Sequence, residues 1–130
     1  MRNKNMAQTY QIYLGRERGK RTVHKVGQAK RGCWQRCKNA DYLIGMSFEI
    51  FPHNELVYNK EKCLNEAEKF IIGVFADRFV VEHGKEYFRT RNHKWADCRE
   101  IFIDEMTRFL EEKGWNYIIH EGWVSPSNAY

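Results

Sequence analysis

The amino-acid sequence predicts an α/β fold of the α+β type, in which helices flank a small, mostly antiparallel central sheet. Hydrophobic residues alternate with polar ones in the short segments 9–14 and 22–26, which is typical of strands. They recur every three or four residues in segments 64–75 and 97–112, which is typical of amphipathic helices. A chain of 130 residues, 42% of them hydrophobic, is long enough for one domain with a single core.

The first two expected strands form an antiparallel hairpin. The chain leaves segment 9–14, turns at residues 16–20 and resumes the alternating pattern over 22–26. In such a hairpin Tyr13 and Lys25 are expected to share one face of the sheet.

Three further extended segments complete the expected sheet. Residues 46–51 form a third strand that Pro52 stops, and residues 80–88 run extended around a turn at Gly84. Residues 115–120 form the last strand.

Three helices are expected between these strands. A short helix covers residues 33–39, and the last helix covers 97–112 and ends at Gly114. The long middle helix has an apolar stripe made of Leu64, Ala67, Ile71, Val74 and Phe75.

Two glutamates of the middle helix are expected to differ in their surroundings. At about 100° per residue, Glu68 falls within the apolar stripe and Glu66 on the opposite, solvent-facing side. A carboxylate in an apolar stripe costs free energy unless it is paired, hydrogen-bonded or bound to a metal. Glu68 is therefore a candidate metal ligand, and a buried salt bridge or the edge of the stripe is the structural alternative.

Positive charge is concentrated near the N-terminus. The first 38 residues hold 11 of the 22 lysines and arginines but only one of the 17 acidic residues, so their net charge is +10 and that of the remaining 92 residues is −5. Such a face attracts phosphate backbones, and a solubilising surface is the alternative. The candidate nucleic-acid contacts are Arg16, Arg18, Lys20, Arg21, His24, Lys30 and Arg31. For His24 the alternative is a structural role, which is the commoner one for a histidine on a sheet face.

The four cysteines do not form a familiar zinc pattern. Cys33, Cys37, Cys63 and Cys98 lack paired C-x2-C spacing, and no feature indicates export to an oxidising compartment. We expect free thiols, with a zinc-stabilised interaction domain as an alternative that bound zinc in the purified protein would reveal.

Several short motifs, taken in order, resemble the GIY-YIG nuclease superfamily. They are Gln11-Ile12-Tyr13 in a first strand, Lys25-Val26-Gly27 closing a second, Arg36 nine residues later, Glu68 on the next long helix and Gly84-Lys85-Glu86-Tyr87-Phe88 beyond it. The resemblance covers about residues 9–90 and is closest to the phage and virus branch, whose second motif reads KIG.

The resemblance implies roles for four residues. Tyr13 would be the tyrosine of the first motif, Lys25 would occupy the tyrosine position of the second, Arg36 would be the catalytic arginine and Glu68 the metal ligand. Three departures stand out: Gln11 replaces a glycine, Lys25 a tyrosine, and Ile72 a histidine whose role is absent or moved to His83.

The implied organisation is a nuclease core with short additions. Residues 1–8 would be a basic N-terminal arm, 9–90 the core, 91–124 a C-terminal helix and strand, and 125–130 a flexible tail. Substrate specificity is then expected from residues 92–130 or from a homodimer.

The residue types suit phosphodiester hydrolysis on chemical grounds as well. The reaction adds negative charge at phosphorus, so a guanidinium and a divalent cation are suitable stabilisers. Mg²⁺, or Mn²⁺, needs few protein ligands because it retains water. We expect a metal-dependent endonuclease acting on DNA; a catalytically silent nucleic-acid-binding module with the same fold is the alternative.

A soluble intracellular location is expected. The chain has no apolar run near the roughly 20 residues that cross a bilayer, and its first residues lack the apolar stretch of a signal peptide.

Overall fold

The computed structural model describes residues 9–33, 40–51 and 59–124, in which six strands form one sheet. All neighbouring strands are antiparallel, and their order across the sheet is β4-β5-β2-β1-β3-β6. The strands are β1 (Gln11–Glu17), β2 (Val23–Ala29), β3 (Tyr42–Phe51), β4 (Val80–His83), β5 (Tyr87–Arg89) and β6 (Asn116–Val124).

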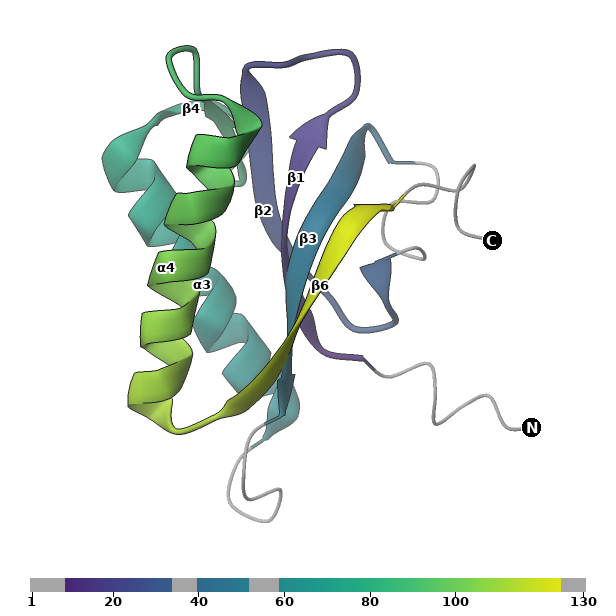
Figure 1. The fold of residues 1–130 in the computed structure, drawn as a ribbon, viewed down its shortest axis with the longest axis vertical. Helices are drawn as coiled ribbons and strands as arrows, with labels where there is room; N and C mark the ends of the chain where they lie inside the picture. Colours follow the sequence, from purple (N-terminus) through teal and green to yellow (C-terminus); the bar gives the residue numbers. More distant parts are fainter. Residues whose placement is uncertain (1–8, 34–39, 52–58, 125–130) are drawn as a thin grey trace, which may run out of the picture.

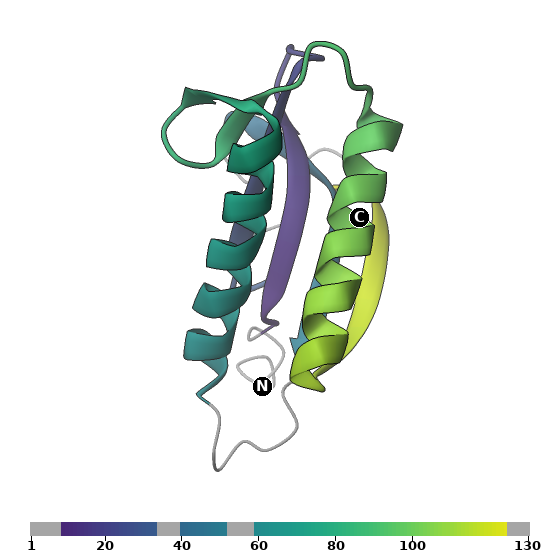
Figure 2. The same ribbon diagram turned by 90° about the vertical axis from the view of Figure 1, so that its left-hand side faces the viewer.

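Two helices cover one face of this sheet, α3 (Lys60–Arg78) and α4 (Trp95–Lys113) (Figures 1 and 2). The Asn59 side chain caps α3 by accepting a hydrogen bond from the Lys62 amide at 3.0 Å. Gly114 ends α4 in the left-handed conformation, with φ of 74°. Both helices place their apolar faces against the sheet, where Phe48, Phe75, Phe88 and Phe102 meet in the main core.

The strand pattern gives the two faces of the sheet different contents. Ile12 and Leu14 of β1 belong to the main core under the helices, so Tyr13 between them faces the other way. We call this second face, which α3 and α4 do not cover, the open face of the sheet. On it Tyr13 forms a smaller buried cluster with Ala29, Cys33, Tyr42 and Ile44. The candidate site lies on this second face.

The predicted fold class is confirmed, and several elements are longer than expected. β3 begins at Tyr42 and not at residue 46, because it pairs with β1 as far as Glu17. Gly45 interrupts the apolar pattern of β3. A glycine is needed there because a Cβ atom would collide with the rings of Trp95 and Trp123. β6 likewise continues to Val124 along β3.

The C-terminal helix and strand are integral to the domain. α4 contributes Cys98, Phe102, Met106 and Leu110 to the main core, and β6 forms the edge of the sheet beside β3. The expected short helix at 33–39 lies, apart from residue 33, outside the described residues, as do the arm 1–8 and the tail 125–130. Within the described part of the chain, no helix is long and apolar enough to cross a membrane.

Candidate active site

Tyr13 and Lys25 meet on the open face of the sheet, as the hairpin pattern predicted. In the β1–β2 register Gly15 pairs with Lys25 and Tyr13 with Gly27. Lys25 Nζ donates a hydrogen bond to the Tyr13 hydroxyl at 2.8 Å. Tyr13 is 0% exposed and Lys25 3% exposed, so the contact is made away from bulk water.

Gly27 makes this contact sterically possible. A Cβ atom at position 27 would lie 2.5 Å from the Tyr13 hydroxyl oxygen and 2.9 Å from Lys25 Nζ, distances that carbon atoms do not tolerate. The glycine of the second motif is therefore explained by the close approach of the phenol to the backbone of β2.

Three tyrosine rings surround the Lys25 ammonium. Its Nζ lies 5.0 Å from the ring centroid of Tyr13, 4.5 Å from that of Tyr42 and 5.4 Å from that of Tyr87. The negative faces of aromatic rings stabilise a cation at such distances. Tyr13 also donates a hydrogen bond to the Tyr42 hydroxyl at 3.0 Å. Burial, followed by the charges of nearby acidic groups and Tyr42, raises the pKa of Tyr87 to about 12 and keeps it protonated at neutral pH.

Two carboxylates complete the cluster, one from the β4–β5 turn and one from α3. Glu86 Oε1 lies 2.8 Å from Lys25 Nζ in an ion pair. Glu68 accepts a hydrogen bond from Gln28 Nε2 at 2.8 Å, and its carboxyl group is within hydrogen-bonding reach of Glu86. Burial raises the pKa of Glu68, and the charge of Glu86 acts in the same direction, whereas the Gln28 hydrogen bond and Lys25 oppose the rise.

The short length of β5 explains how α3 reaches this cluster. β5 begins at Tyr87, opposite Lys25, and the amide of Val26 donates to the Glu86 carbonyl oxygen at 3.1 Å. Glu86 thus lies at the end of its strand, beside the last residues of β2. There it can contact Lys25 from the open face and Glu68 from the helical side.

Glu66 lies on the other side of α3, as the helical pattern predicted. It is exposed and forms an ion pair with Lys113 of α4 at 2.5 Å. The two glutamates, two residues apart, therefore differ in their surroundings: Glu68 is half-buried and Glu66 is exposed.

Five of the predicted nucleic-acid contacts lie at the surface. Arg18, Lys20 and Arg21 are exposed in the β1–β2 turn, and Lys30 and Arg31 are exposed after β2. Lys20 forms an ion pair with Glu17 at 3.2 Å, and Lys30 forms one with Glu61 at 3.3 Å.

The predictions for two other basic residues need correction. Arg16 lies within β1 and not in the turn, with its guanidinium carbon 5.0 Å from the centroid of the Trp123 ring. His24 is 0% exposed, stacks on Trp95 and shares a 2.6 Å hydrogen bond with Thr90, so it is an interior residue and not a surface phosphate contact. Burial, helped by the charge of Arg16, lowers the pKa of His24 to about 4.

The remaining residues singled out in the sequence are His83, Arg36 and the four cysteines. His83, a suggested substitute for the missing histidine, stacks on Tyr87 with ring centroids 4.1 Å apart and pairs with Glu17 at 3.0 Å. Arg36 and Cys37 lie outside the described residues. Cys63 and Cys98 are free thiols in the helical core, whereas Cys33 lies on the open face of the sheet, where its Sγ donates a hydrogen bond to Gln11 Oε1 at 3.1 Å.

Three members of the cluster were not predicted as site residues. Glu86 and Tyr87 lie inside the motif at 84–88, so their position in that motif was an available signal. Tyr42 had no such signal, because it reaches Tyr13 only through the pairing of β1 with β3.

Comparisons with protein-family models, with curated proteins and with solved structures found no match to this chain.

Proposed function

We propose that this protein is a divalent-metal-dependent endonuclease that hydrolyses phosphodiester bonds in DNA, with an active site of the GIY-YIG type. The observation that best supports the proposal is the Tyr13–Lys25–Glu86–Glu68 cluster. It combines a phenol and a buried ammonium that are hydrogen-bonded to each other, a turn carboxylate, Glu86, that pairs with the ammonium, and a half-buried helix carboxylate, Glu68, nearby.

The side chains of the cluster suit distinct parts of the reaction. Water attacks the phosphorus atom, one phosphorus–oxygen bond forms and another breaks, and negative charge increases on the phosphate oxygens. The Tyr13 oxygen, which contacts Lys25 and Tyr42, would take a proton from the attacking water once it is in the phenolate form. Lys25 would provide positive charge beside it. Arg36 is assigned as the guanidinium on the resemblance alone.

The carboxylates fit a divalent cation. Glu68 would hold Mg²⁺ or Mn²⁺, with Glu86 beside it, because these ions prefer oxygen ligands. When bound, such an ion would stabilise the charge that develops on the phosphate. A cation there would also relieve the cost of a half-buried carboxylate that faces a second negative group.

Metal-dependent nicking of supercoiled plasmid DNA tests the proposal. We expect nicking by the wild type with Mg²⁺ or Mn²⁺, and its loss in Glu68→Gln with fold and DNA binding retained. Glu66→Gln is the matched control and should nick normally. Full activity of the Glu68 variant, or equal loss in both variants, would refute the assignment.

The hydrogen bond between Lys25 and Tyr13 leads to a test of what Lys25 does. An unperturbed tyrosine titrates near pH ~10, and an adjacent positive charge favours the phenolate. We expect Lys25→Met to lower the rate at neutral pH and to move the rising limb of the pH–rate profile, which reports deprotonation of Tyr13, to higher pH. An unshifted profile with a raised KM would instead show that Lys25 only holds a phosphate oxygen.

One observation favours a second candidate, a catalytically silent nucleic-acid-binding module. Tyr13 is 0% exposed and Lys25 3% exposed, with Lys25 also engaged by Glu86, so substrate could reach them only after a rearrangement. DNA binding without metal-dependent nicking, under conditions where the fold is intact, would support this candidate.

A further inference from the structure

A second group of basic side chains lies further along β5. A cavity of about 420 Å³ is lined by Lys20, Thr22, Val23, Glu82, Arg89 and Arg91, and we call it the Arg89–Arg91 pocket. A neighbouring cavity of about 310 Å³ shares both arginines and reaches Phe79 and His93. Strands β4 and β5 and the β1–β2 turn therefore come together around this pocket.

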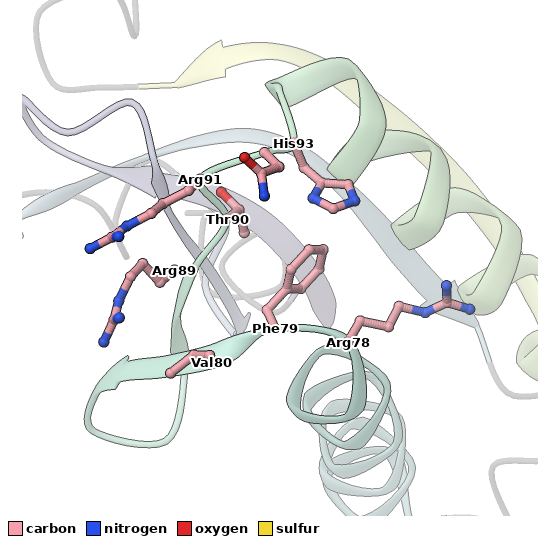
Figure 3. Close-up of a pocket in the computed structure, with 8 residues that line it drawn as sticks. Arg78, Phe79, Val80, Arg89, Thr90, Arg91 and His93 are labelled. Atoms are coloured by element: carbon pink, nitrogen blue, oxygen red, sulfur yellow. The ribbon is translucent and has the colours of Figure 1, made fainter.

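The two arginines extend in the same direction. Figure 3 shows the guanidinium groups of Arg89 and Arg91 on one side of their segment, pointing away from Phe79 and His93, whereas Arg78 extends the opposite way. β5 ends at Arg89, and Arg91 lies in the turn that follows, which the His93 amide closes by donating to the Thr90 carbonyl oxygen at 2.9 Å. The pocket thus presents two neighbouring guanidinium groups.

The lining has an excess of positive charge. It contains Lys20, Arg89 and Arg91 but a single carboxylate, Glu82, which accepts a hydrogen bond from Arg89 Nε at 2.7 Å. Arg91 is exposed and has no ion-pair partner among the residues that the structure describes. Lys20 pairs with Glu17 outside the lining and Arg89 pairs with Glu82, so Arg91 supplies the excess positive charge of the pocket.

We propose that the Arg89–Arg91 pocket binds a phosphate group of a nucleic-acid backbone. Planar guanidinium groups match the oxygens of phosphate in pairs of hydrogen bonds, and the Thr22 hydroxyl adds a donor. Arg18 and Arg21 are exposed in the same β1–β2 turn as Lys20 of the pocket, and they add positive charge for an extended polyanion. The choice of backbone phosphate over free phosphate, which has the same chemistry, rests on the proposed function.

Binding of a fluorescent DNA duplex, measured by anisotropy at several salt concentrations without divalent metal, tests the proposal. We expect Arg91→Gln to weaken binding roughly tenfold, since a hydrogen-bonded charge is lost. The slope of log affinity against log salt should fall by about one. Arg108→Gln on α4, which removes another exposed arginine, is the control and should bind like the wild type.

A second variant should act in the opposite direction. Glu82→Gln removes the carboxylate that competes for Arg89, so we expect tighter binding of the duplex. Arg91→Gln behaving like Arg108→Gln, or Glu82→Gln weakening binding with its fold intact, would overturn the pocket. Neither result bears on plasmid nicking, so the nuclease proposal would stand or fall separately.

Calorimetric titration with inorganic pyrophosphate distinguishes the two sources of phosphate. Pyrophosphate binding that depends on Arg91, without any binding of the duplex, would assign the pocket to a free phosphate ligand and overturn the backbone assignment. Duplex binding that depends on Arg91, in a protein that does not nick DNA, would support the pocket and refute the nuclease.

Discussion

Strand β2 carries two buried basic side chains in succession, His24 and Lys25. They lie on opposite faces of the sheet and have different partners there. His24 lies on the helical face against Trp95, with one ring nitrogen bonded to Thr90 and Nε2 lacking a hydrogen-bond partner among the described residues. Burial lowers the pKa of His24 to about 4, so the ring is neutral at pH 7. Lys25, on the open face, contacts a hydroxyl group, a carboxylate and three aromatic rings.

The difference separates a structural residue from a candidate functional one. An unpartnered charge in an apolar interior is costly, and a histidine avoids that cost by losing its proton. On the open face the fold instead supplies a carboxylate, Glu86, together with oriented phenol oxygens. Burial alone therefore does not identify a site; the partners assembled around the buried group do.

The largest expected effect is a loss of folding stability in acid, caused by protonation of His24 on the face covered by the helices. The pKa of His24 is about 4 in the folded protein against 6.5 ordinarily, so the unfolded chain binds the proton more readily between these values. Stability from neutral His24 is complete above pH 6.5 and is lost as the pH falls towards about 4. The loss should reach about 3 kcal/mol.

Urea unfolding from pH 7 to pH 4 measures this loss. His24→Phe keeps a flat ring beside Trp95 but cannot titrate, so its stability should fall less steeply than that of the wild type. His120→Gln, at an exposed histidine paired with Glu49, should leave the wild-type pH dependence in place. Parallel curves for the wild type and His24→Phe would contradict the assignment.

A smaller effect is expected on the open face, from Gly27→Ala. The added Cβ would lie 2.5 Å from the Tyr13 hydroxyl oxygen, so Tyr13 or β2 must move. We expect a loss of about 1–3 kcal/mol in the free energy of unfolding, together with loss of any nicking activity.

Gly73→Ala is the matched control for this substitution. Gly73 lies within α3 with nothing within 4 Å of the added Cβ, so alanine should stabilise the protein by about 1 kcal/mol through helix propensity. Equal stability changes in the two variants would show that the space around Gly27 is not limiting.

The sequence predicted the parts of the fold that depend on local pattern. The hairpin placed Tyr13 and Lys25 on one face, and the helical period separated Glu68 from Glu66, as the structure confirms. It did not predict Tyr42 at the site, because that contact depends on which strand lies beside β1.

His24 shows a second limit of pattern reading. The sequence pattern does not tell which face of the sheet is covered by helices, so it leaves open whether the His24 ring is at the surface or in the interior. α4 brings Trp95 over the ring, and a residue that would be a plausible phosphate contact on an open surface becomes interior.

The smallest expected effect is the change in folding stability caused by replacing Glu68, the α3 carboxylate near Glu86. Because burial raises the pKa of this carboxyl group, folding favours its protonated form. The stability that Glu68 contributes is therefore complete at acid pH and is lost as the pH rises through its folded pKa. At pH 7 we expect Glu68→Gln to be slightly more stable than the wild type, since an amide can still accept from Gln28 and can donate to Glu86.

Thermal unfolding at pH 7 and pH 4, with and without Mg²⁺, tests this expectation. The stability difference should shrink at pH 4, which lies below the ordinary glutamate pKa of 4.5 and below the raised pKa of folded Glu68, so the protonated form predominates in both states. Mg²⁺ should raise the Tm of the wild type but not of Glu68→Gln, because a ligand that binds only the folded state stabilises it.

Glu66→Gln, which loses only a surface ion pair with Lys113, should change stability by less than about 1 kcal/mol and keep the response to Mg²⁺. A Glu68 variant that is less stable at pH 7 would show that its carboxylate is held as a structural partner of Gln28, and a Mg²⁺ response that survives in that variant would move the metal site elsewhere.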